Sequence, residues 1–197
     1  MRFTLVVGWF LILFWQEERR PLRRRVERRV PRLVRNGIVA GTTAAALHFV
    51  EPLVMRLTST AARQRWGIVP KLRCASWMRN TVTLLLMDYT LYIWHVLTHR
   101  VPILWRMHLV HHLDPDLDVS TAIRFHVAEL LVSVVWRAAQ IVFIGVTPAC
   151  LKVWQTITML SVAFHHSNVR LSPAFERAGQ VDRDTTDARH PPFSRSG

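Results

Sequence analysis

Cysteine is scarce in this chain, and its scarcity excludes several kinds of small domain. The 197 residues include only two cysteines, Cys74 and Cys150, which lie far apart and form no C-x-x-C pair. They therefore provide neither a disulfide framework nor a zinc-ribbon pattern. Isolated free cysteines usually behave as small buried apolar residues, and we interpret both in this way.

Acidic residues are also few, with 13 aspartates and glutamates against 26 lysines and arginines, a formal net charge of +13. Half of the residues are nevertheless hydrophobic. The charge and the apolar content are segregated along the chain: nine arginines lie within residues 16–36, whereas residues 3–15, 37–55 and 81–95 are largely apolar. The length predicts one modest domain.

The first apolar segment, residues 3–15, is followed by an arginine run and lacks the small-residue cleavage site of a signal peptide, so we interpret it as a membrane anchor. Every later apolar segment has helical rather than strand length: residues 37–55, which end near Pro52, then 77–99, 127–146 and 151–164. The last is short enough to enter a bilayer without crossing it. The predicted fold class is all-α, an integral membrane helical bundle with about four spanning or re-entrant helices.

The arginine block at residues 16–36 allows three interpretations. Basic runs often bind nucleic acid, but this block has no aromatic residue for base stacking, so no nucleic-acid partner is predicted. A solvated charged face accounts for part of it. Its position between apolar segments is typical of a short cytoplasmic loop, which would also contact anionic lipids. We expect a multi-pass protein whose histidine groups face the cytoplasm, although a second basic loop at residues 56–76 weakens the charge bias.

Seven of the ten histidines fall into three tight groups. The groups are His95 and His99; His108, His111 and His112; and His165 and His166. Spacings of three or four residues put imidazoles on one face of a helix, where they can share a metal ion. Imidazole suits iron, copper, zinc and nickel, and no thiolate lies nearby in the sequence to favour a cysteine-bound zinc.

A lone histidine in an apolar helix is more often a packed residue than a metal ligand, and we interpret His48 in this way. Seven clustered histidines at the ends of membrane segments are different. Burying so many polar rings without a shared task would be costly, and ionisable groups inside membranes usually serve a function. The histidine groups therefore predict a metal site.

The order of these groups resembles the fatty acid hydroxylase and sterol desaturase superfamily. The matching motifs are D-x6-H-x3-H from Asp88 to His99, H-x2-H-H from His108 to His112, and H-H-S-N from His165 to Asn168. The stretch VPILWRMHLVHHLDPDLDVSTAIRFHVAE resembles the family's segment between the second histidine box and the next helix. The resemblance covers about residues 35–172.

The resemblance implies a membrane enzyme with a non-haem centre of two irons on the cytoplasmic side. Such enzymes use O2 to hydroxylate or desaturate a C–H bond of a lipid substrate, with electrons from an external donor of the cytochrome b5 or ferredoxin-reductase type. Zinc is a potential substitute for iron, because imidazole ligands do not exclude it.

By matching position, the implied metal ligands are His95, His99, His108, His111, His112 and His166, with His165 as a further candidate. Asp88 and Glu129 are implied as partners that orient the imidazoles. Arg124 and His126 match an R-x-H-x-x-E pattern of the family. His126 is either a ligand or a packing residue at a helix end, and the sequence leaves both open.

The chain departs from the family pattern after residue 172, where a last H-x2-H-H box is expected. Residues 173–197 are polar, contain one histidine, His190, and have the composition of a disordered tail. One allowed set of codons for RDTTDARHPPFS, shifted by one nucleotide, encodes V-T-P-R-M-H-A-I-H-H-S. We hypothesise that the chain is a frameshifted or misassembled form of a complete enzyme.

These observations divide the chain into an N-terminal anchor with an arginine-rich loop (1–36), a fatty acid hydroxylase-like membrane domain (37–172) and the polar tail. Loss of three ligands would leave one iron under-coordinated, so we expect this chain to be inactive. Two other functions stay open: a catalytically dead membrane protein that binds metal or serves as a scaffold, and a lipid-surface anchor whose histidines sense pH.

Overall fold

The computed structural model describes residues 2–172, which form a bundle of six α-helices with short connections. The elements are α1 (Arg2–Arg19), α2 (Arg29–Arg63), η1 (Val69–Lys71), α3 (Ser76–Arg100), α4 (Pro102–His112), η2 (Thr121–Ile123), α5 (Val127–Gln140), η3 (Ile141–Gly145) and α6 (Pro148–His166). The described residues contain no strand, and one isolated bridge joins Pro21 to Val169. The predicted all-α fold class is confirmed.

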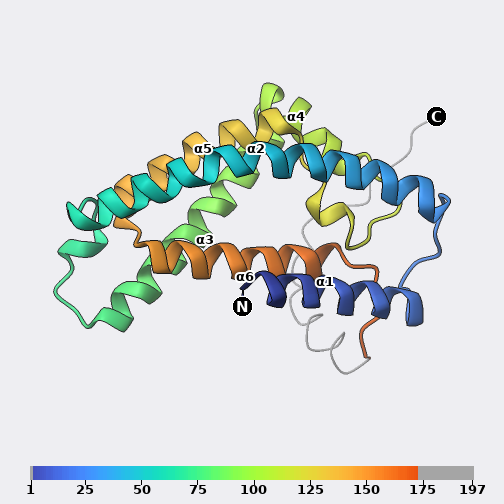
Figure 1. Cartoon of the computed structure of the whole chain (residues 1–197), viewed down its shortest axis with the longest axis horizontal. Coiled ribbons are helices and arrows are strands. Elements are labelled where there is room, and N and C mark those ends of the chain that lie inside the picture. The colour runs from blue at the N-terminus through green and yellow to red at the C-terminus, as the bar shows by residue number, and fades with distance from the viewer. Residues whose placement is uncertain (1, 173–197) are drawn as a thin grey trace, which may run out of the picture.

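The helices form two roughly parallel rows with a third helix between them. α2 and α5 lie side by side along one long side of the molecule, and α6 with α1 lies along the other (Figure 1). α3 crosses between the rows, and α4 folds back beside its C-terminal end. The three histidine groups lie at the end of α3, along α4 and at the end of α6.

Prolines at first positions begin two of these helices. Pro102 begins α4 and Pro148 begins α6, at positions where a helix does not need the missing N–H group. Thr147 caps α6, since its side-chain oxygen accepts a hydrogen bond from the Cys150 amide at 3.2 Å. The short turn at Val101, between α3 and α4, brings the first two histidine groups together.

The second apolar segment, residues 37–55, is part of a longer helix, because α2 continues through Pro52 to Arg63. A proline inside a helix removes one backbone hydrogen bond. The residues that follow it compensate, since Val54, Thr58 and Ala61 are buried at helical spacing. Their packing against the core holds the last part of α2 in the helical conformation.

The main core lies where α2, α3, η3 and α6 meet. Met87 of α3, Ile141 of η3 and Leu151 of α6 are fully buried there. A second, smaller cluster seats α1 and the loop after α4 on α6, and it consists of Leu13, Val119, Ala122 and Ala163. Residues 3–15, expected as a membrane anchor, thus belong to a helix that packs along α6, where the Trp9 indole N–H donates to the Leu160 carbonyl at 3.0 Å.

Two helices are long and apolar enough to cross a membrane by length and composition: α2 and the continuous helix Val127–Gly145. Only 11% and 22% of their apolar windows is buried, so their apolar side chains face outward, unlike those of a core helix in a soluble protein. Side chains such as Phe49 and Phe143 are about three-quarters exposed. These two helices are candidates by length and composition alone, and the expectation of about four spanning or re-entrant helices stays a prediction.

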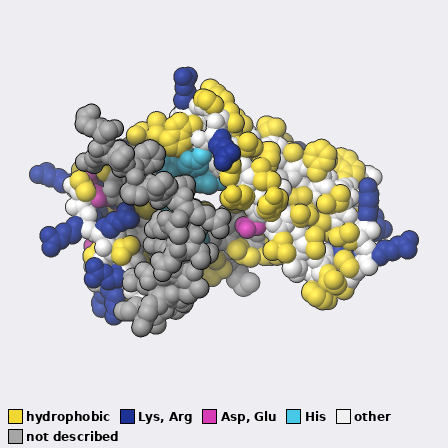
Figure 2. Space-filling view, turned by 180° about the vertical axis from the view of Figure 1, so that it is seen from behind, with side chains coloured by type: hydrophobic (Ala, Val, Ile, Leu, Met, Phe, Trp, Pro, Cys, Tyr) yellow, Lys and Arg dark blue, Asp and Glu magenta, His cyan; other side chains and the backbone are white. Residues whose placement is uncertain are grey.

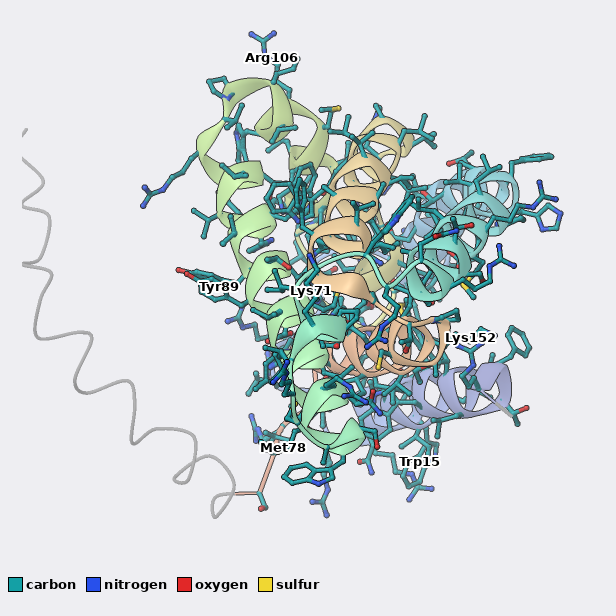
Figure 3. The ribbon with its side chains drawn as sticks, turned by 90° about the vertical axis from the view of Figure 1, so that its left-hand side faces the viewer. Trp15, Lys71, Met78, Tyr89, Arg106 and Lys152 are labelled. Carbon is teal, nitrogen blue, oxygen red and sulfur yellow. The ribbon has the colours of Figure 1, made fainter. Side chains whose placement is uncertain are left out.

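One face of the molecule carries a large apolar surface. Hydrophobic side chains cover much of one half of this face, and lysine and arginine side chains gather at both ends of the long axis (Figure 2). Tyr89 of α3 is exposed and points away from the bundle (Figure 3), and its ring stacks with that of Tyr92. An exposed apolar surface of this kind suits contact with lipid.

Polar residues within α5 turn inward, away from the apolar surface. The Gln140 side-chain amide donates to the Thr90 hydroxyl at 2.5 Å and to the Met87 carbonyl at 3.3 Å. The Arg137 guanidinium lies over the Trp154 ring, 4.2 Å from its centroid, and donates to Gln140 at 3.1 Å. These contacts satisfy polar groups that would otherwise be costly in an apolar environment.

Close packing of two glycines closes the end of the bundle away from the arginine-rich loop. Gly67 and Gly145 both have positive φ, at 85° and 86°. A Cβ atom on Gly145 would lie 2.3 Å from the Trp66 carbonyl oxygen, and a Cβ atom on Gly67 would lie 2.3 Å from the Gly145 nitrogen. Only glycine combines this conformation with so close an approach.

Candidate metal centre

The first histidine group lies in the last two turns of α3, and α4 folds back against it. His95 and His99 are one helical turn apart, and the turn at Val101 brings His108 beside them. Nitrogen atoms of His95, His99 and His108 lie within 4.8 Å of one another. Within residues 2–172 this is the one set of three side chains arranged to share a metal ion.

His108 is held with one ring nitrogen directed into this group. Its Nδ1–H donates to the Glu129 carboxylate at 2.7 Å, and both side chains are buried. Glu129 lies in the first turn of α5, where the helix dipole favours a negative charge. Because the carboxylate accepts a hydrogen bond from Nδ1–H, the Nε2 atom is the ring nitrogen that is left to bind a metal. This Nε2 atom is buried and lacks a hydrogen-bond partner among the described residues.

His111 and His166 face each other in a second arrangement. The Nδ1–H of His111 donates to the Arg124 carbonyl at 3.2 Å, and that of His166 donates to the Val162 carbonyl at 2.8 Å. Each ring therefore carries its lone pair on Nε2, and these two atoms are 2.7 Å apart. Two lone pairs at this distance repel each other unless a cation lies between them.

His112 lies between the two arrangements. Its ring centroid is 4.9 Å from those of His99 and His108 and 5.4 Å from that of His111. Burial lowers the pKa of His111 to about 3, and burial followed by the neighbouring imidazoles lowers the pKa of His112. Both rings are therefore neutral at pH 7, which is the state that binds metal.

The unsatisfied imidazole nitrogens indicate whether these residues suit a metal ion. An orphaned, buried imidazole nitrogen and two opposed lone pairs are costly in a protein interior. Transition metal ions bound at these two places would satisfy the three atoms, and neutral imidazoles are suitable ligands for them. The residues fit a histidine-bound metal.

Three of the predicted site residues lie apart from this cluster. His165 is exposed and contacts the Ser161 hydroxyl at 3.2 Å. Asp88 is exposed, two helical turns before His95, and makes no hydrogen bond to an imidazole within the described part of the chain. His126 is the N-cap of α5, since its Nδ1 accepts a hydrogen bond from the Ala128 amide at 3.1 Å. The geometry thus favours the helix-end interpretation of His126.

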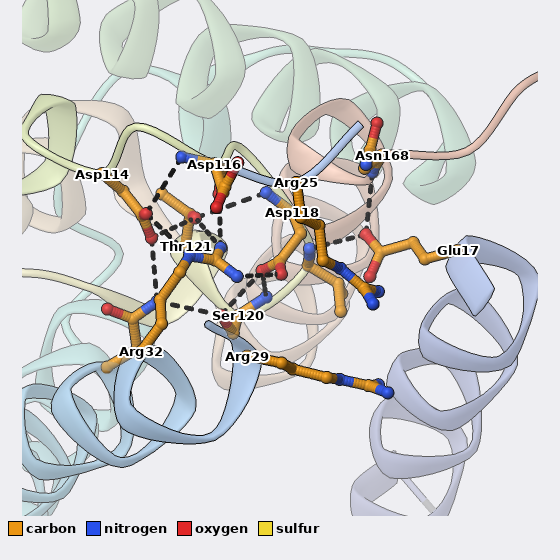
Figure 4. Close-up of polar contacts among 12 residues, drawn as sticks. Glu17, Arg25, Arg29, Arg32, Asp114, Asp116, Asp118, Ser120, Thr121 and Asn168 are labelled. Carbon is orange, nitrogen blue, oxygen red and sulfur yellow. Dashed lines mark hydrogen bonds and ion pairs between the residues drawn. The ribbon is translucent and has the colours of Figure 1, made fainter. Parts of the chain in front are cut away.

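A buried ionic network beside the cluster was missed from the sequence. Arg32, at the start of α2, donates to Asp114 at 2.8 Å and also contacts Asp118 (Figure 4). Burial by itself would raise the pKa of Asp114, but hydrogen bonds from Arg32, Asn36 and Thr121 lower it to about 2. Three aspartates in D-P-D-L-D, directly after the second histidine group in an acid-poor chain, were the signal for it.

The departure from the family pattern, with His190 and the frameshift hypothesis, falls on residues 173–197 and lies outside the described residues. The disordered tail and the boundary at residue 172 therefore stay predictions.

Comparison with known proteins gives one match. The sequence model of the family described as fatty acid hydroxylase matches residues 80–190, more than half of the chain. The match begins within α3 and takes in all seven clustered histidines. No match was found among curated proteins, and none among solved structures.

Proposed function

We propose that this chain, which belongs to the fatty acid hydroxylase family, is built as a membrane-bound non-haem di-iron oxidoreductase for lipids. The reaction class would be O2-dependent hydroxylation or desaturation of a lipid C–H bond. The observation that carries the proposal is the convergence of imidazole nitrogens with fixed lone pairs: the unpartnered Nε2 of His108, and the Nε2 atoms of His111 and His166 at 2.7 Å.

The histidines would hold two metal ions in two adjacent positions. His95, His99 and His108 would form one position, since their nitrogens lie within 4.8 Å. His111 and His166 would form the other, and His112 is close enough to contribute to either. Iron bound there would supply the activation of O2, and zinc would occupy the same imidazoles when iron is scarce.

The protein's own residues prepare these ligands. Glu129 fixes the tautomer and the ring orientation of His108, as carboxylate partners of metal-bound histidines do. The backbone carbonyls of Arg124 and Val162 fix His111 and His166 in the same sense. His111 also stacks on the Phe125 ring, with 5.2 Å between centroids and an angle of 8° between planes. The rings are therefore oriented before a metal arrives.

The proposal includes a location in the membrane and an electron donor on the cytoplasmic side. The exposed apolar surface and the candidate spanning helices α2 and α5–η3 support a multi-pass membrane protein. The arginine-rich loop supports a cytoplasmic location of the histidines by the positive-inside rule. A donor of the cytochrome b5 or ferredoxin-reductase type on that side would provide the electrons.

A second function has one observation in its favour. Among residues 2–172, the position at His111 and His166 has two oriented imidazoles, fewer than the three at the other position. A metal with so few protein ligands is poorly fixed, so this chain would bind metal without catalysing lipid oxidation. The alternative is therefore a catalytically dead metal-binding or scaffold protein of the same family.

Metal analysis and product analysis together test these proposals. The full chain, purified in detergent under reducing, iron-replete conditions, should carry at least one transition metal, and His108→Ala with His111→Ala should remove most of it. Unchanged metal content in that double variant would refute the ligand assignment. A version with a helix ending in M-H-x-x-H-H grafted after Arg177 should bind two irons and incorporate labelled oxygen into lipid.

The variant His95→Ala, made in the grafted protein, separates catalysis from better folding, because it should abolish the product and leave the helix content unchanged. Robust product from the ungrafted chain would refute the scaffold alternative. Two bound irons without any oxidised lipid would count against the hydroxylase proposal.

A further inference from the structure

The first turns of α2 and the loop after the second histidine group share one buried network. At its centre is Arg32, whose side chain is fully buried. Its Nε–H donates to Asp114 at 2.8 Å, and its two terminal nitrogens donate to the Asp118 carboxylate and to the Asp116 carbonyl (Figure 4). A longer hydrogen bond reaches the Thr121 hydroxyl at 3.4 Å, so one guanidinium binds four points of the loop formed by residues 113–126.

Asn36 extends this network from the next turn of α2 towards the histidines. Its side-chain amide donates to Asp114 and to Ser120, both at 2.9 Å. Its side-chain oxygen accepts from the Arg124 guanidinium at 3.3 Å. The backbone carbonyl of Arg124 in turn accepts the Nδ1–H of His111 at 3.2 Å. A continuous series of contacts therefore connects Arg32 to a metal-site imidazole.

The cost of this arrangement indicates that it has a specific role. Burying an arginine is expensive unless carboxylates and hydrogen bonds compensate it fully, and a less charged core would often be as stable. The planar guanidinium fixes the direction of each of its hydrogen bonds, which a lysine cannot do. The neighbouring Arg35 shows the ordinary alternative, since it is exposed and pairs with Glu27 at 2.7 Å.

We infer that Arg32 is a positioning residue of the metal centre, which with Asn36 fixes the 113–126 loop so that the Arg124 carbonyl holds His111 with its Nε2 towards His166. This inference rests on the proposed metal function of the histidines and deepens it. His108 is oriented separately, by Glu129 of α5. Arg32 therefore acts on one of the two metal positions and leaves the other unaffected.

Variants of the full chain in detergent test this inference. Arg32→Gln removes the guanidinium, Arg32→Lys keeps the charge but has one nitrogen in place of three, and Asn36→Ala breaks the next link while leaving the ion pairs of Arg32. Arg35→Gln is the matched control, because it removes an exposed arginine one turn away on the same helix. Far-ultraviolet circular dichroism reports whether each variant keeps its helices.

Two measurements follow the metal site itself. The first is a cobalt(II) titration followed by the visible absorption of the bound ion. Arg32→Gln should raise the dissociation constant of one position roughly 10–100-fold, as changes behind a metal-bound histidine typically do, and leave the other unchanged. The second is the tautomer of His111 in the metal-free protein, read from [15N]histidine NMR and assigned with His111→Gln. The tautomer with hydrogen on Nδ1 should give way to a mixture in Arg32→Gln and Asn36→Ala.

The remaining variants show whether Arg32 acts through the geometry of its hydrogen bonds or through its positive charge alone. Arg32→Lys should restore the tautomer and the metal affinity only in part, whereas Arg35→Gln should behave as the unchanged chain. Full rescue by lysine would show that charge suffices and would overturn the inference. So would an unchanged His111 tautomer in both Arg32→Gln and Asn36→Ala, or equal weakening of both metal positions with the helices intact.

The design separates this inference from the proposed function. If the unchanged chain binds no cobalt, the proposed function fails, and the tautomer of His111 still decides whether Arg32 orients it. If Arg32→Gln does not fold, Asn36→Ala provides the same measurement with the ion pairs in place.

Discussion

Replacing Glu129 by glutamine tests whether a buried carboxylate prepares His108 to bind metal. The carboxylate accepts the Nδ1–H of His108 at 2.7 Å, and the side chains of Glu129 and His108 are only 6% and 4% exposed. Glutamine keeps the volume and one acceptor oxygen, so the ring can stay in place. It removes the negative charge that makes the opposite nitrogen, Nε2, a stronger metal ligand.

The expected loss of metal affinity follows from this geometry. Removing a carboxylate behind a metal-bound histidine typically weakens binding by roughly 10–100-fold, which corresponds to about 1.4–2.8 kcal/mol at 25 °C. A second effect acts on folding. The other carboxylate oxygen of Glu129 is buried without a partner among the described residues, and a glutamine NH2 there would be an unpaired donor, costing about 1–3 kcal/mol.

Competition with a metal-chelating dye, using zinc or cobalt in detergent, measures the affinity of the position formed by His95, His99 and His108. Glu51→Gln is the control, because that carboxylate pairs with Gln155 at 3.1 Å and belongs to no histidine contact. An affinity in Glu129→Gln equal to that of the control would refute the role of the carboxylate. A decrease in thermal stability alone, without weaker metal binding, would do the same.

Three further predictions concern folding and orientation. Gly145→Ala should destabilise the fold by roughly 1–3 kcal/mol, because Gly145 has a positive φ and a Cβ atom there would lie 2.3 Å from a backbone oxygen. Gly37→Ala, whose Cβ atom would have no other atom within 4 Å, should not destabilise it, and equal melting temperatures of the two variants would contradict the close approach. Burial alone would raise the pKa of Asp118, but Arg32 lowers it overall, so the stability that Asp118 contributes should be complete above about pH 4 and decline below it. The free energy of chemical unfolding should therefore depend less on acid pH in Asp118→Asn than in the unchanged chain, and an identical dependence would refute the ion pair. Leu117→Cys, at a half-exposed position after the second histidine group, should resist an impermeant thiol reagent outside intact cells, and ready labelling would invert the proposed topology.

The sequence was sufficient to predict the fold class and the histidine groups. Apolar segments of helical length predict helices, and spacings of three and four residues place imidazoles on one face. These are local properties, so they hold without knowledge of the tertiary structure. The apolar segment 37–55 does not reveal the full length of α2, because buried residues beyond Pro52, such as Ala61, stabilise a helix that the proline alone would end.

The grouping of the ligands needed the structure. His108 and His111 belong to one sequence motif, yet His108 faces α3 and α5, whereas His111 faces the end of α6. This division depends on how α4 folds back at Val101 and on where α6 ends, and neither follows from helical periodicity. The same limit applies to Arg32, which cannot be told from its eight arginine neighbours in residues 16–36 until the loop with its aspartates is in place.

The scarcity of acidic residues is informative once their positions are known. In a chain with a net charge of +13, exposed carboxylates would have many positive partners on the surface. Several are instead buried at defined points: Glu129 behind His108, Asp114 and Asp118 on Arg32, and Asp116 on the backbone amides of the arginine-rich loop. Each of these carboxylates either orients a histidine or fastens the loop that runs from the second histidine group to the helix containing Glu129. The buried carboxylates of this basic chain therefore hold the histidine cluster and its neighbouring loop in place rather than serving as surface charges.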